Sequence, residues 1–562
     1  MWNRPIWSLV WNVVRGYVAG RDGVLGLVFL AILGLGAVFP NFGDVFFRTI
    51  EGAGTRLARK RGLAILTLAG ACVALRLSLL WLYPVPIPRV HDEFSNLLLA
   101  DTLARGRLSN PPHAMHLFLE TFHVNQFPFY VSKYPPAQGA ALALGQILGC
   151  AWTGVLLSAA GMCAAVLWML QGWMAPRWAF LGGLLVFFRL ATFSYWVNSY
   201  WGGTVPAIGG ALVTGALPRI IRDWRARDAL LLAVGAAILM NSRPMEGLFL
   251  CLPVATVLLW RLMGAARPSP RVALRNFLLP VGLVLAAAAG FGLYYNWRTT
   301  GDAFVMPYVV NEQTYVSAPT LFWMPSRAPL HYENAQFDAF YNGWTREEWM
   351  SRRTHSLRYI LVIALTFSFF FLWPELCLPL IAVPWVLRET GMRFLLVQAA
   401  LCVCGFFLVA YFEPHYAAPL VGTLFALVVR GIRRFRRLKF AGRPIGLAFS
   451  RVSVLAAVLF GPLHGYGMAG ELALSSMDAR SVFEARLKAR SGKHLVLVRY
   501  SPQHVVGEEW VYNHADADGS KVVWAREIPG VDVRPLLDYY KDRDVWVVEP
   551  DHSPPILTPY VK

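Results

Sequence analysis

Long apolar stretches alternate with short polar connections along most of this 562-residue chain. Leu63–Tyr83, Val281–Tyr295 with its flanks and Leu395–Tyr411 reach or approach the roughly 20 residues that a membrane-spanning helix requires. The same pattern repeats along the chain and predicts eleven spans. They are expected near residues 63–83, 151–171, 178–193, 204–220, 229–241, 246–263, 276–296, 362–387, 393–411, 414–430 and 447–467.

Basic residues concentrate in five of the connections, at residues 48–61, 219–227, 261–275, 388–393 and 430–443. Basic loops of membrane proteins remain on the cytoplasmic side, so we expect all five there. The other connections then lie outside, including two long loops at residues 84–135 and 297–356 and everything after about residue 468.

Three segments do not follow the simple pattern. Residues 23–42 are apolar enough to span, but a span would place Arg4 and Arg15 outside, so an interfacial or re-entrant position is the alternative. Pro136–Gly149 is predicted to be a short helix that enters the membrane from the outer face. Residues 494–500, 522–526 and 545–548 alternate like strands, with a helix near residues 535–541.

These patterns define a fold class: an α-helical polytopic membrane protein with a small C-terminal α/β domain outside the membrane. The expected divisions are an N-terminal segment at residues 1–62, a transmembrane domain at 63–467 and the α/β domain at 468–562. No repeat of 20–50 residues is evident along the sequence.

Composition supports a bilayer protein and excludes several other classes. Hydrophobic residues make up 56% of the chain and charged residues only 15%, against about 25% charged in soluble domains. A soluble enzyme, a disordered chain and a collagen-like fibre are therefore excluded. The net charge of +19 belongs to the apolar part, since residues 471–562 hold 12 Lys and Arg against 14 Asp and Glu. The basic excess therefore reflects topology and does not indicate nucleic-acid binding.

Candidate chemistry lies in the outer connections. Asp92 and Glu93 follow the first span directly, and Lys133 and Tyr134 stand at the end of the same loop. Neighbouring carboxylates do not face one another on a helix, so one can point into a cavity while the other holds a neighbour. The alternative is that both form the acidic first turn of a helix at residues 93–105, stabilised by its dipole.

Three further outer turns carry polar groups at the membrane boundary, where such residues are candidates for function. They contain Asn198, Tyr200 and Trp201, then Arg243 and Glu246, then His415 and Tyr416. The aromatic residues could equally belong to the ordinary interfacial belt. Arg243 opposes the charge bias of outer loops and matches a lipid-linked phosphate, although an Arg243–Glu246 ion pair is the simpler alternative.

Metal and nucleotide chemistry have less support. His113-x-x-His116 has a spacing that could bind a divalent metal, but no third ligand is fixed by the sequence and Pro111-Pro112 indicates a loop. The seven cysteines are odd in number and lie in apolar segments, without a CxxC pair. Phosphate-binding loops and serine-hydrolase elbows do not occur in a strand–turn–helix context.

An ordered set of motifs resembles a known family. DEFSNLLLADTLARGRLSNPPH, SKYPPAQG, SYWVNSYWGG, NSRPMEG and PHYAAP, beginning at residues 92, 132, 194, 241 and 414, together with the many spans, resemble the GT-C superfamily of polyprenyl-phosphate-sugar-dependent glycosyltransferases. Protein O-mannosyltransferases and the aminoarabinose transferase of lipid A share this plan. The chain is most similar to a less characterised bacterial branch, over roughly residues 60–562.

The resemblance implies roles for individual residues. Asp92 would be the general base, Glu93 would support it or bind the acceptor, and Lys133 would lie near the donor phosphate with Arg243 as an added candidate. The remaining candidates for substrate binding are His91, Tyr134, Asn198, Tyr200, Trp201, Glu246, His415 and Tyr416. Asn198 has no acid nearby, unlike the corresponding loop of the aminoarabinose enzymes, so a second catalytic carboxylate is in question.

The sequence therefore predicts a glycosyltransferase in a bacterial inner membrane, with its active site and C-terminal domain in the periplasm. It would move a hexosyl or pentosyl group from a polyprenyl-phosphate donor to a lipid, polysaccharide or protein of the cell envelope, with inversion. A hydrolase or phosphotransferase using the same groove is one alternative. A transporter or flippase of lipid-linked sugars is another, although related halves, which transporters often show, are not evident.

Overall fold

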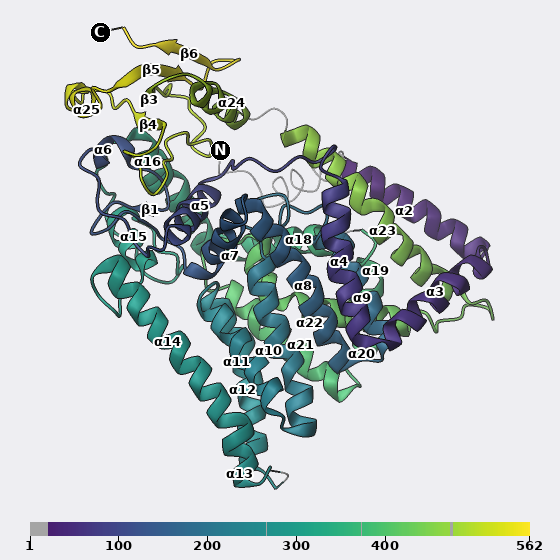
Figure 1. The fold of residues 1–562 in the computed structure, drawn as a ribbon. Helices are drawn as coiled ribbons and strands as arrows, with labels where there is room; N and C mark the ends of the chain where they lie inside the picture. Colours follow the sequence, from purple (N-terminus) through teal and green to yellow (C-terminus); the bar gives the residue numbers. More distant parts are fainter. Residues whose placement is uncertain (1–20, 266, 373, 473–475, 562) are drawn as a thin grey trace.

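The computed structural model describes residues 21–265, 267–372, 374–472 and 476–561. Helices form the body of the molecule, and a small sheet with two helices lies at one end of it (Figure 1). The predicted class, a polytopic helical protein with a C-terminal α/β unit, is confirmed.

Each of the eleven predicted spans contains a helix, although not always of the predicted length. In chain order these helices are α4 (Arg61–Ser78), α8 (Ala151–Trp173), α9 (Pro176–Leu190), α10 (Thr204–Asp223), α11 (Ala226–Met240), α12 (Pro244–Met263), α14 (Leu279–Thr300), α18 (Ser356–Phe371), α21 (Thr390–Phe406), α22 (Val421–Phe435) and α23 (Ile445–Leu472). By length and composition, six helical segments in the described ranges can cross a membrane. These are Arg61–Ser78, Ala151–Trp173, Thr204–Asp223, Pro244–Met263, Pro270–Thr300 and Pro414–Phe435.

Some helices outside this set are too short to cross a hydrocarbon core by themselves. Helix α9 has 15 residues and α21 has 17, which correspond to about 22 and 26 Å at 1.5 Å per residue, below the roughly 30 Å of a hydrocarbon core. Helix α9 packs against α8 and α22, so neighbouring helices surround much of its length.

The predicted span at residues 362–387 is wrong as a single helix. Helix α18 ends at Phe371, and the chain continues through turns into α19 (Cys377–Leu380) and α20 (Val383–Val386). Pro374, Pro379 and Pro384 follow in quick succession, and proline removes the backbone donor that a continuing helix needs. A single apolar run thus folds into one helix and two short turns of helix.

Helices α8, α10 and α22 form the centre of the body. In the span candidates that contain them, 72%, 72% and 89% of the tested residues are buried, against 6% for the span that contains α14. Figure 1 shows α14 standing at the edge of the body accordingly. Close packing depends on glycine: a Cβ at Gly210 would lie 1.9 Å from the Pro419 carbonyl oxygen, and one at Gly154 would lie 1.9 Å from that of Ala141.

The N-terminal elements pack on one side of the body. Helix α2 (Arg21–Val38) lies along α23, where Leu25, Phe29 and Leu33 form an apolar cluster with Ala456 and Phe460. Helix α3 (Asp44–Arg59) contacts α9 and α4. Arg4 and Arg15 lie outside the described residues, so whether α2 spans the membrane stays a prediction.

Short elements build the outer loops. The first loop contains α5 (His91–Ala104), α6 (His116–Leu119), β1 (Val124–Asn125), β2 (Val131–Ser132) and α7 (Pro136–Ile147), and the last of these matches the predicted short helix. The second contains α15 (Pro307–Tyr315), α16 (Ala335–Phe337), a π-helical turn at Asp338–Trp344 and α17 (Thr345–Thr354). A third outer turn contains a 3-10 helix at Pro414–Leu420, which leads into α22. Two other short elements lie outside these loops: α13 (Pro270–Val272) and a π-helical turn at Ala273–Leu278, both of which precede α14.

The C-terminal unit follows the predicted pattern with two additions, a helix at Ser476–Ala489 and a strand at Ile556–Pro559. It consists of α24 (Ser476–Ala489), β3 (Lys493–Val498), β4 (Val522–Arg526), α25 (Arg534–Tyr539), β5 (Arg543–Glu549) and β6 (Ile556–Pro559). The strand order is β4-β3-β5-β6, in which β3 is parallel to β4 and β5 while β6 is antiparallel to β5. Strand β6 was not predicted; it contains Pro559 and pairs at the edge of the sheet, where proline is tolerated.

This unit is attached firmly to the first outer loop. Phe94 of α5 belongs to the apolar cluster on one side of the sheet, and Phe118 and Leu119 of α6 belong to the cluster that contains Leu495 and Leu536. The sheet therefore uses side chains of the first loop to complete its own core.

Candidate active site

Helix α5 begins at His91, after the connection that follows α4, and Glu93 fixes its start. The Glu93 carboxylate accepts hydrogen bonds from the backbone N–H groups of Arg89 at 2.7 Å, Val90 at 3.1 Å and Tyr200 at 2.9 Å. Burial raises the pKa of Glu93 to about 7. This geometry is that of a capping group, the simpler of the two interpretations of the acidic pair, and it ties α5 to the turn at Tyr200.

Asp92 takes a different direction from its neighbour. Its Oδ1 accepts a hydrogen bond from the Tyr134 hydroxyl, and its Oδ2 lies 4.0 Å from Nε2 of His123. The side chain is 27% exposed, whereas Glu93 is buried. Adjacent positions on the helix therefore separate one structural carboxylate from one accessible carboxylate.

A short hairpin brings the end of the loop back to α5. Strands β1 and β2 pair Val124 with Ser132, and the Ser95 hydroxyl of α5 contacts both the His123 carbonyl oxygen at 2.6 Å and the Ser132 hydroxyl at 2.7 Å. Lys133 follows β2 directly and donates its backbone N–H to the His123 carbonyl at 3.1 Å. These contacts bring Asp92 and the Lys133-Tyr134 pair together in space although they are about 40 residues apart in the sequence.

Lys133 is held among aromatic rings and opposite charges. Its Nζ lies 5.2 Å from the ring centres of Tyr134 and Tyr308. Burial lowers the pKa of Lys133 to about 8, while the carboxylates of Asp92 and Glu312 oppose that change. The result is an ammonium group that faces the site with little water around it.

Arg243 comes to the same place from the start of α12. Its guanidinium lies 4.2 Å from the centre of the Tyr416 ring, and its Nη1 is 3.7 Å from Oε1 of Glu246. The positive charge of Arg243 is one cause of the lowered pKa of Lys133, so the two cations share one region. The Arg243–Glu246 pair considered from the sequence is present, but the arginine also faces the site.

Glu413 joins this cluster and was not among the predicted site residues. Burial and, to a smaller extent, the negative charge of Asp92 raise its pKa to about 7, and Arg243 opposes the shift. Glu413 precedes the PHYAAP motif, so an acid at an outer turn was the available signal. His123 and Tyr308 were missed as site residues as well, and nothing in their spacing marks them.

Several predicted substrate-binding residues are used elsewhere. Asn198 accepts from Nε of Arg76 at 3.1 Å and donates to the Ser194 carbonyl at 2.9 Å, so it organises its own turn. The Tyr200 hydroxyl donates to the Pro86 carbonyl at 2.8 Å. His91 is buried and its Nε2 contacts the Val506 carbonyl oxygen at 2.8 Å. These contacts position the walls of the site and engage the side-chain amide of Asn198, the hydroxyl of Tyr200 and one ring nitrogen of His91.

The remaining predicted residues form an aromatic wall. The Trp201 and His415 rings lie 4.8 Å apart, and Nδ1 of His415 contacts the Tyr195 hydroxyl at 3.0 Å. His415 and Tyr416 are adjacent, and their ring centres are 5.0 Å apart. The wall links the Arg243 region to the turn that Glu93 holds.

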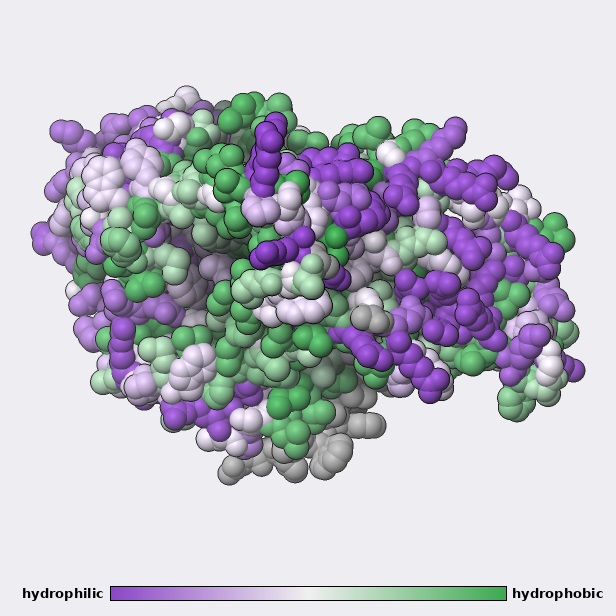
Figure 2. All heavy atoms as spheres, turned by 90° about the horizontal axis from the view of Figure 1, so that it is seen from below, coloured by the Kyte–Doolittle hydropathy of each residue, from purple (hydrophilic) through white to green (hydrophobic). Residues whose placement is uncertain are grey.

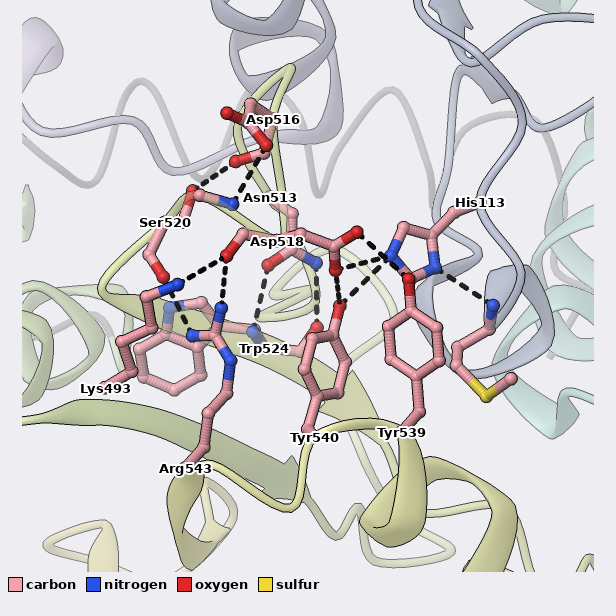
Figure 3. Close-up of polar contacts among 12 residues, drawn as sticks. His113, Lys493, Asn513, Asp516, Asp518, Ser520, Trp524, Tyr539, Tyr540 and Arg543 are labelled. Atoms are coloured by element: carbon pink, nitrogen blue, oxygen red, sulfur yellow. Dashed lines mark hydrogen bonds and ion pairs between the residues drawn. The ribbon is translucent and has the colours of Figure 1, made fainter.

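The His113-x-x-His116 pair does not assemble as a metal site. His113 contacts Asp518 and the Tyr540 hydroxyl, each at 3.1 Å, and joins the first loop to the C-terminal unit (Figure 3). His116 lies against the Phe127 ring at 4.6 Å. Within the described ranges, no group of three or more His, Cys, Asp or Glu side chains is arranged to hold a metal ion.

Comparisons with known proteins identify similar folds. The sequence matches no described protein family and no curated protein. Among solved structures, ArnT from Cupriavidus metallidurans in the apo state is 11% identical, with a TM-score of 0.48 and coverage of 87% of this chain and 93% of that one. The same protein bound to undecaprenyl phosphate gives 11% identity, a TM-score of 0.47 and coverage of 85% and 92%.

An oligosaccharyltransferase from Archaeoglobus fulgidus, in complex with Zn and sulfate, is also similar. Its identity is 11% and its TM-score 0.46, and the match covers 86% of this chain and 67% of that one. These proteins are members of the GT-C superfamily that the sequence resembles. At such identity and TM-scores the likeness concerns the fold, and the function must be argued from the side chains of this chain.

Proposed function

We propose that this protein is an integral membrane glycosyltransferase that uses a polyprenyl-phosphate-linked sugar. One observation carries the proposal: an accessible carboxylate, Asp92 of α5, shares a site with two cations, Lys133 from the end of the first outer loop and Arg243 from the start of α12. A base beside a phosphate-binding pair is what transfer of a sugar from a lipid phosphate requires.

The base would act on the acceptor hydroxyl. Tyr134 occupies Oδ1 of Asp92 and orients the carboxylate, which leaves Oδ2 for the incoming O–H group. As the acceptor oxygen bonds to the anomeric carbon, its proton passes to Oδ2. Attack from the face opposite the leaving group inverts the anomeric centre.

The cations would act on the leaving group. The bond between the anomeric carbon and the phosphate oxygen breaks, and its electron pair stays on the polyprenyl phosphate. A poorly hydrated ammonium at Lys133 and a guanidinium at Arg243 stabilise that growing negative charge more strongly than water-exposed cations would. The lipid tail would lie among the helices, and the site would face the periplasm of a bacterial inner membrane.

The acceptor is proposed only as a hydroxyl-bearing molecule of the cell envelope. Glu413, beside Asp92, supplies a second carboxylate whose proton affinity differs from that of an ordinary glutamate. Pairs of carboxylates in unlike environments are typical of acid–base sites. Glu413 therefore replaces Glu93 as our candidate for the second functional acid.

The test is sugar transfer by purified wild-type and Asp92→Asn protein, with radiolabelled polyprenyl-phosphate sugars and envelope extract as acceptor. An asparagine still accepts the Tyr134 hydroxyl but cannot take a proton, so we expect a loss of about 10²- to 10⁴-fold with retained folding. Asp538→Asn, an exposed site on α25, is the matched control. Full activity in Asp92→Asn would refute the base, and absence of transfer from every donor would favour a transporter.

A further inference from the structure

The arginines at the end of α22 fall into two groups, and the first is neutralised. Arg430 and Arg434 pair with Glu389 at 3.1 and 2.8 Å. Arg436 forms two hydrogen bonds with Glu51 of α3, at 2.8 and 2.7 Å. These three arginines therefore have protein carboxylates as counter-ions and serve to fasten α22 to its neighbours.

The second group has no such counter-ion. Arg433, Arg437 and Lys439 have no acidic partner among the residues that the structure describes. With Arg177 and Arg436 they line a cavity of about 440 Å³, and no acidic residue lines it. The cavity is completed by Trp178, Leu438, Pro444 and Leu447. Excess positive charge is thus concentrated in one hollow of ligand size.

The cavity lies where predicted membrane spans begin and end. It lies where α9 begins, α22 ends and α23 begins, at the face remote from the C-terminal sheet. Figure 2, which views that face, shows hydrophilic side chains gathered over the half of the molecule where α3 and α23 lie. The charge rule used for topology makes this the cytoplasmic side.

Two further features point to a lipid. Trp178 lines the cavity beside the cations, and its buried indole Nε1 has no hydrogen-bond partner among the described residues. Leu438 and Phe440 are 50% and 74% exposed next to the cavity, where they would contact acyl chains. A free anion would use the cations but not these apolar surfaces.

We propose that this cavity binds the phosphate-bearing headgroup of an anionic phospholipid of the cytoplasmic leaflet. Guanidinium groups of Arg433 and Arg437 would each offer two parallel donors to phosphate oxygens, and Lys439 would supply a further charge. The site is separate from the proposed catalytic cluster and does not depend on the proposed reaction.

The experiment measures lipid binding to purified full-length protein by native mass spectrometry. The probe is phosphatidylglycerol, with phosphatidylcholine as the uncharged comparison and inorganic phosphate as the free-anion comparison. Because each basic residue near a membrane surface contributes about fivefold to binding of an anionic lipid, Arg433→Gln/Arg437→Gln should weaken phosphatidylglycerol binding about 30-fold. The matched control is Arg271→Gln/Arg275→Gln, which removes the same charge from another of the five basic segments.

The outcomes separate the possibilities. Selective loss in the cavity variant, with partial recovery in Arg433→Lys/Arg437→Lys, which keeps the charge but not the paired donors, supports the proposal and excludes a folding defect. Equal loss in the cavity and control variants would show a general surface-charge effect and overturn it. The proposal also fails if wild-type protein does not prefer phosphatidylglycerol, or if millimolar phosphate displaces it and binds in its place.

Discussion

The lowered pKa of Lys133 makes a direct prediction about how donor use depends on pH. The ammonium must be charged to hold the donor phosphate, and its pKa is about 8 in the unliganded protein. A phosphodiester stays anionic across neutral and alkaline pH, so of these two partners only the lysine changes charge there. Since kcat/KM reports the free enzyme, we expect kcat/KM for the donor to fall tenfold per pH unit above about pH 8.

The magnitude follows from burial. The shift of the pKa from the ordinary value of 10.5 to about 8 means that the charged ammonium is less stable in the protein than in water by roughly 3 kcal/mol. Burial lowers the pKa, and Asp92 and Glu312 offset part of this effect. A bound phosphate adds negative charge beside Nζ and raises the pKa again. The alkaline limb of kcat should therefore lie at higher pH than the limb of kcat/KM.

The assay is initial-rate sugar transfer between pH 6 and 10 with the donor varied. Lys133→Arg should remove the limb near pH 8, because a guanidinium stays charged throughout this range. Lys133→Met should give low donor affinity at every pH. Lys493→Arg makes the same change at the exposed first residue of β3 and should leave the wild-type profile unaltered.

Two results would contradict this account. A wild-type kcat/KM that stays level up to pH 10 would mean that Lys133 is well hydrated, contrary to its position beside the Tyr134 and Tyr308 rings. A limb near pH 8 that persists in Lys133→Arg would assign the titration to another group. Either result would refute the claim that Lys133, with a lowered pKa, is the cation whose charge controls donor binding.

Three other substitutions test the framework of the site. Glu93→Ala should lower the free energy of unfolding by about 2–4 kcal/mol, because buried N–H groups lose their acceptor; unchanged thermal unfolding would contradict the capping role. Arg526→Met should cost about 3–5 kcal/mol, since it leaves Glu509 charged and buried; proteolysis of the C-terminal unit would reveal this. Tyr512→Ala should reduce transfer by displacing Phe94, on which it stacks at 4.1 Å, whereas Tyr512→Phe should retain activity; equal activities would exclude this support of α5.

Much of the fold can be predicted from one sequence alone. Apolar runs predicted the positions of the span helices, and alternating residues predicted β3, β4 and β5. The exception at residues 362–387 shows the limit of hydropathy, which measures how apolar a run is but not whether its backbone can continue. Prolines interrupt the helix in that segment. The short helices α19 and α20 that follow pack against α22, a contact that hydropathy does not predict.

The site was predictable in part because its members lie at loop ends beside spans. Asp92, Lys133, Tyr134, Arg243 and Tyr416 do converge, as their positions at the outer boundary indicated. Whether they act in transfer stays a proposal. Charge and boundary position therefore identify the neighbourhood of a membrane site, whereas roles within it require the three-dimensional contacts.

The division of labour between Asp92 and Glu93 shows why those contacts cannot be read from the sequence. Glu93 is structural because a backbone N–H from Tyr200, 107 positions away, reaches it. His91 is structural because the Val506 carbonyl, 415 positions away, meets its ring. With its neighbours on both sides fixed by distant parts of the chain, Asp92 is left to face Tyr134 and the cations. Its accessibility is thus a product of two long-range contacts, and either one, if broken, should rotate α5 and misplace the base.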